Sequence, residues 1–184
     1  MSGKEHMIVG TTATATMGIG FLVTKTFDSF IYLIPLIIGG FIGSYMPDID
    51  SHNSKARQAF NKILTFLIIA IVIGYILGVA LNVTDIIRFL ENNFKNYFAA
   101  IIFCVLTILG KLSPHRMFTH KWLGTLAFCS CVYFIGDTYL ALGFSMGYIL
   151  HIVCDRFSPR GKNLRFFEFK LPCKNSKNKT TIAW

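Results

Sequence analysis

Long apolar segments alternate with short polar stretches along most of the chain. Six such segments can be read, at residues 7–24, 30–46, 62–81, 97–112, 122–136 and 138–154. A helix needs roughly 20 predominantly apolar residues to cross the hydrocarbon core of a bilayer. The third segment, KILTFLIIAIVIGYILGVAL, reaches this length by itself. The pattern predicts an all-α, polytopic membrane protein, a bundle of about six (four to six) transmembrane helices.

Two places along this pattern allow more than one structure. Only Gly136 and Asp137 separate the last two segments, which are short. They form either two helices or one re-entrant or tilted pair. The second segment contains Pro35 together with Gly39, Gly40 and Gly43 in its second half. These residues permit a kink, whereas small residues in a membrane helix more often let two helices pack closely.

The composition agrees with a membrane protein. Of the 184 residues, 53% are hydrophobic and 15% are charged, and the mean hydropathy is +0.55. The first segment is too long and too rich in Thr and Gly for the apolar region of a cleavable signal peptide. We expect one integral-membrane helical domain over residues 1–170, which carries the polar site, and a basic C-terminal tail over residues 171–184.

The net charge of +9 could indicate a nucleic-acid partner, but no basic helix or aromatic platform accompanies the charge. The distribution of the charge predicts topology instead. With the N-terminus in the cytoplasm, only Lys25, Arg88 and Lys95 of the 18 basic residues lie on the other side of the membrane. Because basic residues accumulate in cytoplasmic loops, both termini are predicted to be cytoplasmic, in a multi-pass protein of the inner (plasma) membrane.

Histidines and aspartates gather at the ends of the apolar segments and avoid their middles. In the six-helix topology all of these ends face the cytoplasm, although the charge count did not use the histidines. The residues concerned are His6, Asp48, Asp50, His115, His120, His151 and Asp155. A transporter or channel would place ionisable residues near the bilayer midplane. The pattern therefore predicts a metal site at the cytoplasmic membrane surface.

Some of these positions also have a local explanation. Asp48 and Asp50 follow Pro47, so they either form a turn or supply hard oxygen ligands that bridge two cations. In the stretch SPHRMFTH, Ser113 and Pro114 match the usual start of a helix.

The spacing of the histidines gives further information. His115 and His120 are five residues apart, about 140° on a regular helix. They face one cation only if the backbone there is irregular. Otherwise they bind different metals, or one of them contacts a metal ligand without binding the metal itself. His151 and Asp155 are four apart, so both project from one helix face. This pair suits Zn²⁺, Mn²⁺ or Fe²⁺, or it forms a His–Asp hydrogen bond without metal.

Four ordered motifs resemble those of the YdjM-like inner-membrane proteins, which are predicted to be membrane-bound metal-dependent hydrolases. They are H-x-x-x-G, P-D-I-D with a following serine, H-R-x-x-T-H and G-x-x-x-H-x-x-x-D-x-x-S/T-P-x-G. The matching residues are His6, Gly10, Pro47, Asp48, Asp50, Ser54, His115, Arg116, Thr119, His120, Gly147, His151, Asp155, Ser158, Pro159 and Gly161. The resemblance covers nearly the whole chain and implies a hydrolase.

Two positions depart from the family pattern. Glu5 stands where Thr is expected, and Lys121 stands where a small Ser is usual. Lys121 would alter the surroundings of the metal, or repel it, if its side chain pointed inward. The His/Asp set is also similar to that of the zinc-dependent bacterial phospholipases C. This analogy favours a phosphoester substrate.

The predicted site residues have distinct roles. The seven histidines and aspartates are expected to bind two or three divalent ions, with zinc first and manganese or iron as alternatives. Asp48 and Asp50 are the catalytic candidates among them, as bridging ligand or proton acceptor. Arg116 is expected to clamp a phosphate or to anchor a headgroup. Thr119 and Ser158 are expected to position ligands or cap helices.

The sequence thus predicts a hydrolase that acts on a phosphoester or related bond of an amphiphilic substrate, with membrane lipids as its partners and no nucleic acid. A transporter or channel, and a non-catalytic membrane protein with a structural metal, remain the alternatives. Substrate, metal identity and oligomeric state stay open. His52 lies outside the motifs and is expected to be a loop residue near the rim of the site.

Overall fold

A computed structural model describes residues 3–76, 83–114, 116–158 and 166–167, and every regular element in these ranges is helical. The all-α prediction is therefore confirmed. In chain order the elements are α1 (Gly3–Val23), η1 (Phe30–Tyr32), α2 (Leu33–Tyr45), η2 (Met46–Asp50), α3 (Lys55–Ile76), α4 (Val83–Leu112), α5 (Trp122–Ile135) and α6 (Thr138–Phe157), where η marks a 3₁₀ helix.

Within the described ranges, four stretches are long and apolar enough to cross a membrane. They are Lys4–Val23, Phe30–Asp50, Lys55–Gly74 and Thr138–Phe157. The apolar helices Tyr97–Leu112 and Trp122–Ile135 are shorter. The fourth predicted segment is the end of the 30-residue helix α4. The number of candidate spans is therefore the lower end of the predicted range.

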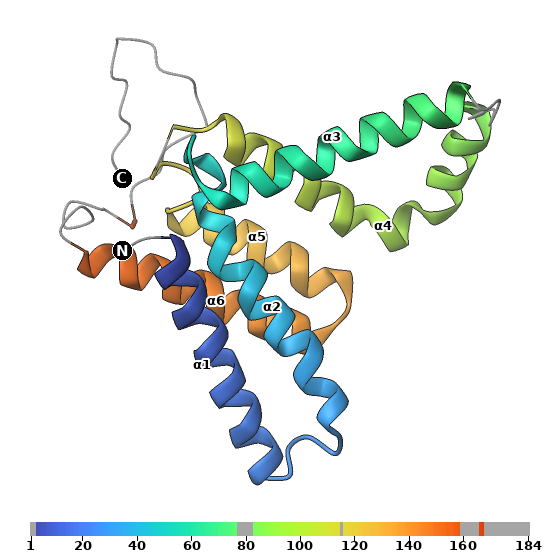
Figure 1. The fold of residues 1–184 in the computed structure, drawn as a ribbon. Coiled ribbons are helices and arrows are strands. Elements are labelled where there is room, and N and C mark those ends of the chain that lie inside the picture. Colours follow the sequence, from blue (N-terminus) through green and yellow to red (C-terminus); the bar gives the residue numbers. More distant parts are fainter. Residues whose placement is uncertain (1–2, 77–82, 115, 159–165, 168–184) are drawn as a thin grey trace.

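Helices α1 and α2 lie side by side, and α6 packs against both (Figure 1). Helix α3 and the first part of α4 extend away from these helices, while α4 also packs against α5. Glycines allow α2 and α6 to approach closely. A Cβ atom added to Gly43 would lie 2.1 Å from the carbonyl oxygen of Phe144, and one added to Gly143 would lie 2.0 Å from that of Leu36. The close-packing explanation of the glycines in the second segment is therefore confirmed.

Gly136 and Asp137 separate two distinct helices. Gly136 ends α5 in the left-handed conformation with a φ of 105°, which glycine adopts without steric cost. Asp137 Oδ1 then accepts a hydrogen bond from the backbone N–H of Leu140 at 2.8 Å and caps α6.

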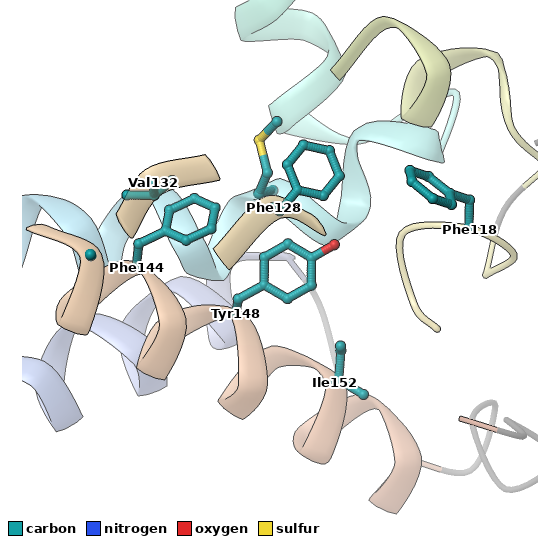
Figure 2. Packing of buried hydrophobic residues seen from close by; sticks show 8 residues of the cluster. Phe118, Phe128, Val132, Phe144, Tyr148 and Ile152 are labelled. Carbon is teal, nitrogen blue, oxygen red and sulfur yellow. The ribbon is translucent and has the colours of Figure 1, made fainter. Parts of the chain in front are cut away.

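The buried apolar core lies between α5, α6, the start of η2 and the segment that precedes α5 (Figure 2). Its members are Met46, Phe118, Phe128, Val132, Ala141, Phe144, Tyr148 and Ile152. Tyr148 also donates a hydrogen bond from its buried hydroxyl to the carbonyl oxygen of Thr119 at 2.6 Å. The core thus fixes the segment that carries Thr119 against α6.

The helix start expected at Ser113 and Pro114 is wrong, because α5 begins only at Trp122. Residues 116–121 form turns and bends instead. Ser113 Oγ accepts a hydrogen bond from the backbone N–H of Phe118 at 3.4 Å. Arg116 adopts a left-handed conformation with a φ of 62°, which a regular helix excludes.

Candidate metal centre

Residues from four parts of the chain meet at one end of the α1, α2 and α6 bundle. His6 lies near the start of α1, and two aspartates lie in η2. One histidine of the described residues lies in the turn before α5, and a histidine and an aspartate lie toward the end of α6. The predicted site residues brought together in this way are His6, Asp48, Asp50, His120, His151 and Asp155. The seventh predicted ligand, His115, lies outside the described residues.

Asp48, His120 and His151 form the tightest part of this cluster. One ligand atom from each lies within 4.8 Å of the others. Asp48 Oδ1 is 3.5 Å from His151 Nε2 and 4.0 Å from His120 Nε2. Both imidazoles are buried, while 21% of the Asp48 side chain is exposed. Two imidazole nitrogens and one carboxylate are a donor set that suits zinc, manganese and iron.

The orientation of His151 is decisive for the chemistry of this group. Its Nδ1 atom lies 2.7 Å from the carbonyl oxygen of Ser44, which can only accept a hydrogen bond, so Nδ1 carries the proton. In the neutral ring, Nε2 then presents a lone pair toward the carboxylate of Asp48. Within the described part of the chain, Nε2 of His151 is buried without a hydrogen-bond partner. A cation between these atoms would satisfy both, so the residues present fit a divalent metal ion.

Asp155 lies beside this group and contacts three other polar side chains. Its Oδ2 atom is 2.8 Å from Arg116 Nη2 and 3.8 Å from His120 Nε2. Its Oδ1 atom is 3.4 Å from His6 Nε2. The ring of His6 also stacks on that of His151, with 4.0 Å between centroids. His6 and Asp155 could therefore hold a second ion next to the first.

Asp50 is buried on the other side of His120. Its Oδ2 atom accepts hydrogen bonds from the backbone N–H of Arg116 and from Thr119 Oγ1, both at 2.8 Å. The same oxygen is 3.4 Å from His120 Nδ1. Asp50 thus contacts the nitrogen of His120 that faces away from Asp48.

Arg116 was predicted to clamp a phosphate or to anchor a headgroup, and the structure shows it in an ion pair with Asp155. Its side chain is 26% exposed, so Arg116 and Asp48 are the parts of the cluster that solvent reaches.

The remaining residues singled out from the sequence lie around the cluster or outside it. His52 is exposed in the loop after η2, as expected. Ser158 ends α6, and its hydroxyl donates to the carbonyl oxygen of Asp155 at 2.7 Å. Lys121 immediately precedes α5, follows His120 in the chain and is buried. The contribution of Ser44 was missed because it acts through its backbone carbonyl, for which the sequence carries no signal.

The fold and the site together define a helical membrane protein with a buried His/Asp group that could hold a metal ion. The family model for the YdjM inner membrane protein matches residues 1–177, so the chain belongs to this family. No curated protein and no solved structure was found to match the chain.

Proposed function

We propose that this protein is a metal-dependent hydrolase that cleaves a phosphoester or related bond of a lipid-like substrate at the cytoplasmic surface of the inner membrane. The observation that carries the proposal is the group of Asp48, His120 and His151, whose ligand atoms lie within 4.8 Å of one another. Catalytic zinc sites commonly use three protein ligands and keep a further position open for water or substrate.

The residues of the cluster would have different roles. Asp48, His120 and His151 would hold one ion, and His6 with Asp155 would hold a second. When bound, such ions supply Lewis acidity and activate water for attack at neutral pH. Because 21% of its side chain is exposed, Asp48 would also be available to accept a proton at the site.

Arg116 would contact the substrate. Its side chain is 26% exposed, and its guanidinium is held by the ion pair with Asp155. A planar guanidinium pairs well with the oxygens of a phosphate group. We therefore assign Arg116 the role of orienting an anionic headgroup while its ion pair with Asp155 keeps the guanidinium at the site.

The place of the site along the candidate spans favours a membrane surface over a transport pathway. His6 lies near the start of Lys4–Val23, and Asp48 and Asp50 lie at the end of Phe30–Asp50. His151 and Asp155 lie toward the end of Thr138–Phe157. Transport sites are typically near the bilayer midplane. The excess of basic residues on the same side of the predicted topology supports a cytoplasmic orientation.

We expect the protein purified in detergent without chelators to contain at least one equivalent of a divalent transition metal, with zinc the first candidate. Elemental analysis of the purified protein measures this content directly. Dialysis against a chelator should remove the metal, and added Zn²⁺ should restore it. Less than a tenth of an equivalent of any transition metal would contradict the proposal.

We expect Asp48→Ala to make cells accumulate an amphiphile that contains a phosphoester or related bond, because the variant lacks the carboxylate ligand and proton acceptor. Untargeted mass spectrometry of lipid extracts compares cells that express the wild type and the variant. Asp28→Ala is the matched control, since Asp28 is exposed between α1 and η1, at the opposite end of these helices. Identical lipid profiles for Asp48→Ala and the wild type would count against a lipid-like substrate.

A further inference from the structure

The carboxylate of Asp50 accepts hydrogen bonds from two groups of the described residues. The backbone N–H of Arg116 and the hydroxyl of Thr119 both donate to its Oδ2 atom at 2.8 Å. Both Asp50 and Thr119 are buried. The Thr119 carbonyl oxygen in turn accepts the hydroxyl of Tyr148 at 2.6 Å, within the core. The carboxylate of Asp50 is therefore tied to the packed interior of the protein.

The same network determines which nitrogen of His120 carries a proton. His120 Nδ1 lies 3.1 Å from Thr119 Oγ1 and 3.4 Å from Asp50 Oδ2. The one hydroxyl proton of Thr119 is donated to Asp50, so its oxygen has only acceptor capacity left for His120. Nδ1 faces two acceptors and therefore carries the proton. The lone pair of the neutral ring is then on Nε2, which is 4.0 Å from Asp48 Oδ1.

We infer that Asp50, together with Thr119, is a positioning residue that fixes His120 with Nδ1 protonated and Nε2 directed to the metal position beside Asp48. The carbonyl of Ser44 fixes His151 in the same way. The two histidines thus present the same type of nitrogen to one point. This inference rests on the metal site proposed above. It gives Asp50 a role different from the ligand predicted from the P-D-I-D spacing.

The conformation of Arg116 supports this role. Its φ of 62° is in the left-handed region, which costs a non-glycine residue free energy. This conformation accompanies the hydrogen bond from the Arg116 N–H to Asp50. An orienting carboxylate outside the ligand set is a common partner of metal-bound histidine, and its loss usually lowers metal affinity 10- to 100-fold.

The test compares two carboxylates with the same chemical change. For Asp50→Asn we expect the zinc stoichiometry of the wild type at saturating Zn²⁺, with a dissociation constant raised about 10- to 100-fold. For Asp48→Asn we expect loss of high-affinity zinc. Competition with a chromophoric chelator measures both quantities. If Asp50→Asn lost the metal as Asp48→Asn does, Asp50 would be a ligand, and an unchanged dissociation constant would also overturn the inference.

Two threonines provide a matched pair of hydroxyl deletions. Thr119→Val removes the hydroxyl that joins Asp50 to His120, so the dissociation constant for Zn²⁺ should rise. Thr125→Val removes a buried hydroxyl that, within the described residues, donates to the carbonyl oxygen of Lys121 at 3.0 Å and does not contact the cluster, so zinc binding should not change. An equal effect of both substitutions would show a general packing effect and would overturn the role of Thr119.

Nitrogen NMR of the metal-free protein separates this inference from the proposed function. With ¹⁵N-labelled histidine, the signal of His120, identified by its absence in His120→Gln, should report a protonated Nδ1. In Asp50→Asn this tautomer should lose population. A protein that binds no zinc but shows this change would contradict the proposed function and support the positioning role. A protein that binds zinc with the same His120 signal in both forms would overturn the positioning role alone.

Discussion

His151→Ala should abolish high-affinity metal binding and turnover while the protein stays folded. The loss in metal affinity should exceed about 100-fold, because loss of a residue that only orients a metal-bound histidine already costs about 10- to 100-fold. His151 is buried, supplies Nε2 to the position shared with Asp48, and supports the ring of His6 by stacking. Metal content, turnover and Tm of the purified variant measure the three consequences separately.

His52→Ala is the matched control for this substitution. His52 is exposed and lies outside the cluster, so metal content and turnover should equal those of the wild type. If His151→Ala retained the metal, the assignment of His151 as a ligand would be wrong. A sharp fall in Tm that follows the loss of metal would identify a structural metal and would count against a hydrolase.

Gly147→Ala should lower the free energy of unfolding and weaken metal binding together. The added Cβ atom would lie 2.3 Å from the Gly40 carbonyl oxygen and 3.0 Å from the Ser44 backbone nitrogen. These are backbone atoms, so α2 and α6 must separate, at a cost of at least about 1–3 kcal/mol. The separation moves the Ser44 carbonyl away from His151 Nδ1. Thermal unfolding in detergent and zinc affinity measure the two effects.

Gly20→Ala gives the matching substitution at a glycine without close neighbours. No heavy atom lies within 4 Å of a Cβ added there, and Gly20 is in α1. This variant should be neutral or up to about 1 kcal/mol more stable, because alanine favours a helix over glycine. Equal Tm values for Gly147→Ala and Gly20→Ala would show that the close approach of α2 and α6 does not contribute to stability.

Local sequence signals predicted the features that depend on neighbouring residues. The apolar runs predicted the helices, and Gly136 and Asp137 predicted a break between the last two segments. The structure resolves the two alternatives left open there, since α5 ends at Gly136 and Asp137 caps α6. The positions of the histidines and aspartates at the segment ends predicted that they would meet. Among the described residues of that set they do meet, because helix ends at the same end of a bundle are neighbours in space.

Features that depend on tertiary contacts could not be predicted in this way. The ion pair of Arg116 with Asp155 joins residues from two distant segments. The sequence pattern predicted only that Arg116 would clamp a phosphate or anchor a headgroup. The stretch before α5 carries a Ser-Pro helix signal, yet residues 116–121 are not helical. There the hydrogen bonds to Asp50 and the burial of Phe118 outweigh local helix propensity. The four candidate spans found among the described residues fall within the predicted range of four to six, because α5 and the apolar part of α4 are shorter than a full span.

The glycine contacts between α2 and α6 have a mechanical consequence. Gly43 packs against the backbone of Phe144, and Gly147 packs against the backbone of Gly40. No side chain lies between the two backbones at these contacts, so a change of rotamer cannot compensate for a shift of one helix. A displacement of one helix along the other would therefore move Asp48, which follows α2, relative to His151 on α6. The distance between Asp48 and His151 is therefore set by backbone contacts between the two helices.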